Sequence, residues 1–205
     1  AGEVRLQQEA TLNSTGGAIN LSGGLTLAGD TMLTAPGVEF SDGVTGNSHN
    51  LTLSSSNDSI KLAGMQLSGV NELTIGGDLD LAGNLDAQNI DITGNTTLLG
   101  NTNLTATGIS FGGTVDGGYT LSTNGTTSFA GVVGGADSLA SLTTVGDTVT
   151  VGGDVKTTGN QIFGGEATIA GDTTFTGDDV SISGLEGGGF NVDFSATSTT
   201  IDAGA

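Results

Sequence analysis

The sequence predicts an all-β protein, a β-solenoid in which short parallel strands are wound into stacked coils. Three observations lead to this prediction: an eleven-residue segment that recurs at a fixed interval, an alternation of apolar and polar residues, and glycine-rich breaks between the alternating stretches. No apolar stripe with helical spacing persists for ten residues, so we expect essentially no helix.

The recurrence is the strongest of these observations. The segment GGLTLAGDTML at 23–33 returns as GNTTLLGNTNL at 94–104 and as GEATIAGDTTF at 165–175, so the three copies are equally spaced along the chain. A β-sandwich predicts no such long-range recurrence, whereas a solenoid does, because equivalent positions of stacked coils meet in register. With coils of roughly 20–24 residues, the interval corresponds to about three coils. We therefore expect the segment to lie at the same place on every third coil.

The whole chain, 1–205, is then one continuous solenoid of about nine coils, with super-repeats at approximately 29–99, 100–170 and, in part, 171–205. Parallel strands stack about 4.8 Å apart, which gives a rod of about 40–45 Å. Alternation within 18–29 (AINLSGGLTLAG) and 147–155 (DTVTVGGDV) predicts strands that bury Leu, Ile, Val and Phe and expose Thr, Asn and Asp. The Gly-Gly, Gly-Asn and Gly-Asp pairs mark the turns, where a positive φ costs glycine little.

Composition excludes several classes of protein. Glycine occurs 38 times and proline once, which does not fit collagen, and the apolar fraction of 35% does not fit a disordered tail. The net charge is −19, and the three cationic residues, Arg5, Lys61 and Lys156, are far apart in the sequence. Nucleic acids and anionic membrane surfaces require clustered cations, so we expect neither as a partner. There is no cysteine for a disulfide framework or a cysteine-based zinc site.

Residues 107–177 carry a resemblance to a known family. The stretches FGGTVDGGYTL (111–121), FAGVVGGADSLASL (129–142) and VKTTGNQIF (155–163) resemble the repeats of filamentous-haemagglutinin-type exoproteins, and the likeness covers most of 23–205. These are large bacterial adhesins, many of them exported by two-partner secretion. The resemblance implies a single-stranded right-handed parallel β-helix that forms an extracellular shaft, passes an outer-membrane transporter during export, and lies in the secreted or cell-surface compartment.

The sequence also departs from that family. It contains no Asn-Pro-Asn motif of the secretion domain and no effector or anchoring domain at its C-terminal end. We expect a segment of a longer protein, whose ligand or receptor the resemblance does not specify. Neighbouring coils, of the same chain or of identical chains, are the partners that a solenoid predicts directly.

For function, we predict no enzyme, and no catalytic, cofactor-binding or metal-binding residue. The best carboxylate pair is Asp78 with Asp80, which a spacing of two places on one strand face while Leu79 and Leu81 point inward. Two further pairs are Asp86 with Asp91 and Asp178 with Asp179, although adjacent residues of a strand face opposite ways. A pectin-type lyase site would need a basic group beside such carboxylates, and a glycosidase needs two carboxylates across a cleft. We interpret these residues as solvated carboxylates of faces and turns.

Other motifs have structural interpretations. GGDLDLAGN (76–84) is the nearest approach to a calcium-binding nonapeptide and lacks its third glycine, so only weak calcium binding at acidic turns stays open. His49 is the sole histidine and is expected on the surface of a polar loop.

GGGFN (187–191) is expected to be a turn. A flat threonine array could order ice, but the outward residues vary too much. Asn-x-Ser/Thr sequons, which composition alone can produce, occur at Asn13, Asn50, Asn57, Asn95, Asn103 and Asn124.

Two functions fit these observations. The first is a structural shaft of a large secreted or cell-surface bacterial adhesin, with no chemistry of its own. The alternative is a repeat of a self-assembling extracellular filament or sheath, whose coils stack end to end through a heterologous contact that does not close.

Overall fold

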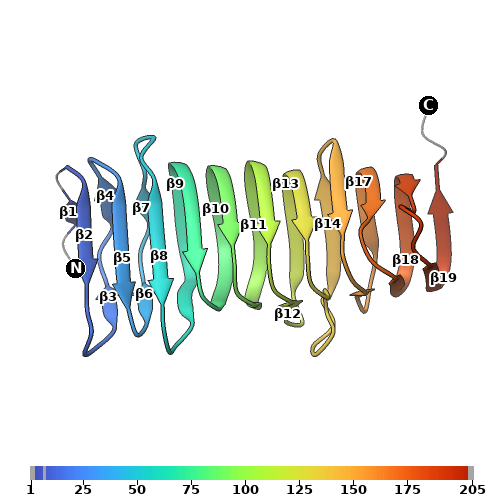
Figure 1. Ribbon diagram of the computed structural model, residues 1–205, viewed down its shortest axis with the longest axis horizontal. Helices are drawn as coiled ribbons and strands as arrows, with labels where there is room; N and C mark the ends of the chain where they lie inside the picture. The colour runs from blue at the N-terminus through green and yellow to red at the C-terminus, as the bar shows by residue number, and fades with distance from the viewer. Residues whose placement is uncertain (1–2, 7, 203–205) are drawn as a thin grey trace.

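The computed structural model describes residues 3–6 and 8–202 and shows an all-β solenoid. About ten turns, with equivalent strands about 19 residues apart, stand side by side along one axis (Figure 1). The predicted fold class is confirmed, although the coils are shorter and slightly more numerous than expected. In the part of the chain that the structure describes, no helix is long and apolar enough to span a membrane.

All the strands belong to one continuous sheet that winds around the axis, and the paired strands are parallel. In chain order they are β1 (Val4–Leu6), β2 (Ala10–Asn13), β3 (Ile19–Leu21), β4 (Leu25–Leu27), β5 (Thr31–Ala35), β6 (Val38–Phe40), β7 (Val44–Thr45), β8 (Leu51–Ser55), β9 (Ile60–Gly76), β10 (Leu79–Ile92), β11 (Thr96–Phe111), β12 (Val115–Asp116), β13 (Thr120–Phe129), β14 (Ser141–Val145), β15 (Thr148–Val151), β16 (Val155–Lys156), β17 (Gln161–Ile169), β18 (Thr173–Glu186) and β19 (Val192–Ile201). Long strands such as β9 and β11 bend around a corner, whereas short ones such as β4 occupy one side of a coil.

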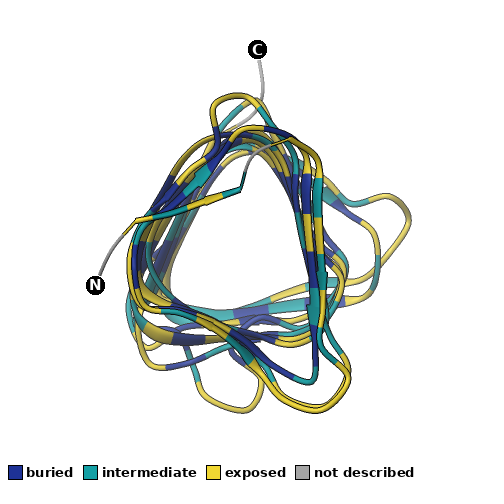
Figure 2. Cartoon of the chain, turned by 90° about the vertical axis from the view of Figure 1, so that its left-hand side faces the viewer, coloured by how far each residue is buried: buried dark blue, intermediate teal, exposed yellow. Residues whose placement is uncertain are grey.

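Seen along its axis, the solenoid is triangular (Figure 2). We name the three sides A, B and C by their inward-facing columns, in which each residue is paired with the next. Side A contains Ile19, Val38, Ile60, Leu79, Thr96, Val115, Val133, Val155, Phe175 and Phe194. Side B contains Val4, Leu25, Val44, Leu67, Leu85, Leu104, Thr123, Thr144, Phe163, Ile182 and Ile201. Side C contains Leu12, Leu33, Leu53, Ile75, Ile92, Phe111, Phe129, Val151 and Ile169.

The core consists of these stacked columns. Leucine, isoleucine and valine dominate it. Two pairs of phenylalanine rings stack between neighbouring coils: Phe111 on Phe129, with centroids 5.1 Å apart, and Phe175 on Phe194, with centroids 5.3 Å apart. The expectation that threonine lies outside is only partly right, because Thr96, Thr123 and Thr144 are buried. Threonine has the shape of valine and fits a β column. Alternation therefore predicts which residues face inward, and the residue type alone does not.

The eleven-residue recurrence has a different geometry from the one predicted. Equivalent residues Leu25, Thr96 and Ala167 do not stack on one another: they lie on sides B, A and C respectively. Counted along the chain, the interval between copies spans eleven sides of the triangle, which are three full coils and two further sides. The expectation that the segment returns to the same place on every third coil is wrong. The unit that recurs is one side with the corner that follows it.

Candidate functional site

Each copy of the recurrent segment builds a corner of the triangle, and glycine makes the corner possible. A Cβ at Gly94 would lie 2.3 Å from the Gly77 oxygen of the preceding coil, and one at Gly165 would lie 2.2 Å from the Gly146 oxygen. At Gly171 the corresponding distance to the Gly152 oxygen is 2.6 Å. Side chains do not approach backbone this closely, so these corners require glycine. At these glycines the backbones of neighbouring coils are in direct contact.

The residue after the second glycine connects one coil to the next. Asp30 Oδ1 accepts a hydrogen bond from the Asn50 amide at 2.9 Å, and Asp172 Oδ1 accepts one from the Asn191 amide at 3.0 Å. Asn101, at the equivalent position of the middle copy, accepts one from the Thr120 amide at 3.1 Å. Each acceptor satisfies a backbone donor that the corner would leave without a partner in the ladder. This explains why Asp and Asn interchange at this position: both offer an oxygen.

The threonine that follows closes the corner on its own coil. Its hydroxyl donates to the carbonyl two residues earlier: Thr31 to Gly29, Thr102 to Gly100 and Thr173 to Gly171, at 3.1, 3.1 and 2.9 Å. The Gly-Asp/Asn-Thr sequence is therefore a corner module, and the three copies place it once at each corner of the triangle. Its hydrogen bonds hold the corner together and link it to the next coil.

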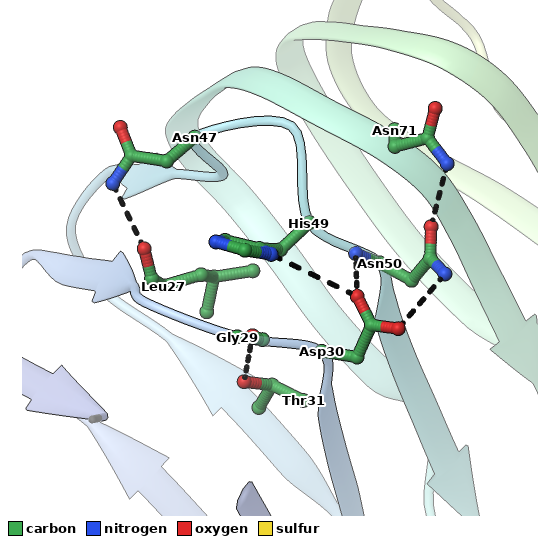
Figure 3. Close-up of polar contacts among 8 residues, drawn as sticks. All are labelled: Leu27, Gly29, Asp30, Thr31, Asn47, His49, Asn50 and Asn71. Carbon is green, nitrogen blue, oxygen red and sulfur yellow. Dashed lines mark hydrogen bonds and ion pairs between the residues drawn. The ribbon is translucent and has the colours of Figure 1, made fainter. Parts of the chain in front are cut away.

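The corner at Asp30 extends into a polar ladder over three coils (Figure 3). Asn50 Nδ2 donates to Asp30 Oδ2 at 3.2 Å, and Asn71 Nδ2 donates to Asn50 Oδ1 at 2.8 Å. His49 Nδ1 lies 3.9 Å from Asp30 Oδ1, and the His49 side chain is 35% exposed. The prediction of a histidine in a polar surface loop is confirmed, and its neighbour in space is this ladder carboxylate.

The three carboxylate pairs behave differently. Asp78 and Asp80 lie on the outer face of side A, with Leu79 and Leu81 buried beneath them as predicted. Asp78 Oδ1 accepts from the Asn95 amide at 2.9 Å, and Asp80 Oδ2 accepts from the Ser59 hydroxyl at 2.6 Å. Both carboxylates thus serve contacts between coils.

The fold separates one of the other two pairs and keeps the other at a corner. Asp86 lies on side B and Asp91 on side C, so the fold separates them. Asp178 and Asp179 are both exposed, and the prediction that they face opposite ways is wrong, because β18 turns a corner there. In residues 3–6 and 8–202, no three His, Asp or Glu side chains gather closely enough to hold a metal ion.

The remaining motifs lie on the surface. Residues 187–191 form a turn in which Gly188 and Gly189 have φ of 59° and 89°, as predicted, and Phe190 is 45% exposed. Among the sequons, Asn50 and Asn95 use their side chains in corner hydrogen bonds, whereas Asn103 and Asn124 point outward from side B. Sequence inspection missed a further sequon at Asn20, which precedes Leu21 and Ser22.

Surface hollows are shallow. One of about 350 Å³ lies on side B over the first coils, where Gly24 and Gly43 have no side chains to fill it. Glu3, Asp42 and Gln66 lie at its edge. Another, of about 260 Å³, lies on side C between Glu9 and Thr52.

No family model, no curated protein and no solved structure matches this chain. The resemblance to filamentous-haemagglutinin-type exoproteins stays a sequence-based prediction.

Proposed function

We propose that this chain is a shaft segment of a large secreted or cell-surface bacterial protein of the adhesin type, which projects a distal binding region away from the cell. The observation that carries the proposal is the uninterrupted column of paired residues on every side of the solenoid. On side C, for example, the outward row runs through successive coils as Thr11, Met32, Thr52, Thr74, Asp91, Ser110, Ser128, Thr150, Thr168 and Glu186.

Such a column supports a mechanical role. Each coil is held to the next by backbone hydrogen bonds on three sides, by buried apolar contacts and by corner residues such as Asp172. A bend or a stretch of the rod breaks several of these contacts at once, so the rod resists both. The net charge of −19 keeps such rods apart in solution except where a face lacks charge.

The ends of the rod support the second candidate, a filament that grows by end-to-end stacking. Inward-facing apolar side chains of the terminal coils are only half-buried, among them Val4, Leu12, Val192 and Phe194. Ile201 is 44% exposed. A further coil, whether of the same chain or of another copy, would cover these groups and gain the burial that their equivalents have inside the rod.

A distance measurement tests the stiffness that the shaft requires. Because the chain has no cysteine, the double variant Thr11→Cys with Glu186→Cys accepts two spin labels at defined positions. These residues lie nine coil steps apart in one row, so we expect a narrow distribution centred near about 43 Å plus the label offsets. The variant Thr11→Cys with Ser110→Cys spans five steps and should give about 24 Å. A broad distribution, or distances not in this ratio, would contradict a rigid shaft.

One further measurement separates the two candidates, and another tests the cell-surface location. Small-angle scattering at increasing protein concentration should show an unchanged rod length for a shaft and a length that grows by whole rods for a filament. Antibodies to the chain should label intact producing cells if the protein lies on the cell surface, and only permeabilised cells if it does not.

A further inference from the structure

The charge of this protein is distributed unequally over the three sides, and side B is nearly free of it. Side B has two rows of outward-facing residues. One row reads, in successive coils, Glu3, Gly24, Gly43, Gln66, Asn84, Asn103, Ser122, Thr143, Ile162, Ser181 and Thr200. The other row contains Arg5, Thr26, Thr45 and Ser68, and farther along Asp86, Thr105, Asn124 and Val145. Between the first and the last coil, Asp86 is the one charged residue among those described in these two rows.

The other two sides carry the carboxylates. The outward row of side A reads Glu39, Lys61, Asp80, Thr97 and Asp116 in successive coils. On side C, Asp91 and Glu186 interrupt the central row, and Glu72 and Glu166 lie in the row beside it. Two copies of a protein with a net charge of −19 repel each other unless they meet through an uncharged face. Side B comes nearest to this condition, with Asp86 in one row and Asp42 at the edge of the hollow as its charges between the terminal coils.

Side B also has exposed apolar side chains in one half of the rod and a hollow in the other half. Ile162 is 44% exposed and Val145 is 53% exposed, both in the C-terminal half of the rod. The hollow over Gly24 and Gly43 lies in the same row as Ile162, near the N-terminal end. A face with a protrusion at one end and a hollow at the other can pair with itself if the second rod is antiparallel.

We propose that side B is the interface of an antiparallel pair of copies of this chain. The two-fold axis lies in the plane of the interface, parallel to the strands, and passes the coil that contains Asn103 and Leu104. Each row then faces the same row of the second copy in reversed coil order. Ile162, three coils after Asn103, faces Gly43, three coils before it, and Val145 faces Ser68.

The charges agree with this arrangement. Asp86, one coil before the axis, faces Asn124, one coil after it, so no two carboxylates oppose each other in the rows. Arg5, five coils before the axis, faces the position of Asp202, which follows Ile201 five coils after it. Each end of the pair therefore brings a cation to a carboxylate. In an isolated copy, Arg5 lies 3.9 Å from the exposed Glu3 carboxylate.

The area is adequate for a specific but modest interface. Ten steps of about 4.8 Å and a strand face about 15 Å wide give roughly 700 Å² from each copy, or about 1,400 Å² in total. This lies within the range of specific protein interfaces. Asn, Ser and Thr rows supply hydrogen bonds across it, while apolar contact is confined to a few residues, so we expect a pair that dissociates on dilution.

Cysteine cross-linking tests the register, because the chain has no cysteine of its own. Asn103→Cys lies beside the axis and faces itself, so mild oxidation should give a covalent dimer. Val145→Cys and Ser68→Cys should cross-link when mixed, and neither should cross-link with itself. Thr97→Cys, exposed on side A, is the matched control and should give only the background of random collisions.

Charge variants test the energetics in sedimentation experiments at low and at high salt. Asn103→Asp sets two carboxylates face to face and should weaken pairing at least tenfold at low salt, with partial recovery at high salt as the charges are screened. Thr97→Asp adds the same charge on side A and should leave pairing within about twofold. A chain that is monomeric under all conditions overturns the proposal. So does self-cross-linking of Val145→Cys, which would indicate parallel rods, or equal cross-linking of Asn103→Cys and Thr97→Cys.

Discussion

The corner glycines allow a sharp test of how the coils are held together. In Gly94→Ala, the new methyl group would lie 2.3 Å from the Gly77 oxygen and 2.7 Å from the Asp78 nitrogen. Ordinary contact begins near 3.4 Å, so the two coils must separate by about 1 Å at this corner. That separation strains the neighbouring hydrogen bonds, from the Asn95 amide to Asp78 at 2.9 Å and from the Leu79 amide to the Asn95 carbonyl at 2.8 Å.

The magnitude follows from these contacts. Overpacking costs about 1–3 kcal/mol, and each weakened hydrogen bond adds up to about 1 kcal/mol. Replacing glycine also restricts the unfolded chain, which offsets about 0.4–1 kcal/mol. We expect a net loss of about 2–4 kcal/mol in the free energy of unfolding. For a chain of this size that lowers Tm by roughly 5–12 °C.

Thermal unfolding followed by circular dichroism measures the loss, and Gly17→Ala is the matched control. A Cβ at Gly17 meets no heavy atom within 4 Å, and its φ lies outside the left-handed region, so this variant should be neutral or slightly more stable. If Gly94→Ala unfolds at the same temperature as Gly17→Ala, close backbone contact is not what selects glycine at the corners.

Three further predictions concern the corner acceptor and the core. Asp172→Ala should lower stability by about 0.5–1.5 kcal/mol, because the Asn191 amide loses its acceptor, whereas Asp172→Asn should be within a few tenths, as chemical denaturation would show. Phe129→Ala removes a ring stacked 5.1 Å from Phe111 and should cost about 3–5 kcal/mol; a loss below about 1 kcal/mol would mean that the column collapses to refill the space. Gln161 is fully buried, and its Nε2 contacts the Thr176 carbonyl at 2.8 Å and the Thr157 hydroxyl at 3.2 Å. Gln161→Leu should cost no more than about 1 kcal/mol, because the Thr176 carbonyl keeps the Thr157 amide as a donor and the buried Gln161 Oε1 has no hydrogen bond to lose; a larger loss, with faster amide hydrogen exchange around Thr176, would contradict this.

Much of the fold could be predicted from the sequence because the alternation of apolar and polar residues shows directly which side chains face the interior. Leu25 and Leu27 are inward and Thr26 outward, as the pattern LTL at 25–27 predicts. The recurrence also indicated a solenoid correctly. Its phase was wrong because a coil holds about 19 residues and not the predicted 20–24, so the interval spans eleven sides where three full coils would span nine.

The polar details were less accessible to sequence reasoning. Asp30, Asn101 and Asp172 are recognisable as equivalent positions, but their role as acceptors requires knowing which amide lies one coil away. The low charge of side B could not be predicted from the sequence for the same reason. Asn84, Asn103 and Ser122 form one row only after the register is known. Short-range patterns predict strands, and the number of residues in each corner decides which side chains become neighbours.

The displacement of the recurrent segment by eleven sides has a consequence for how this rod meets its surroundings. Successive copies are related by a screw: each is turned by two sides of the triangle and raised by about 18 Å along the axis. Similar peptides at 23–33, 94–104 and 165–175 therefore look out in three different directions. A binder that recognises the segment would find its copies spaced around the circumference, and several binders could occupy one rod without colliding.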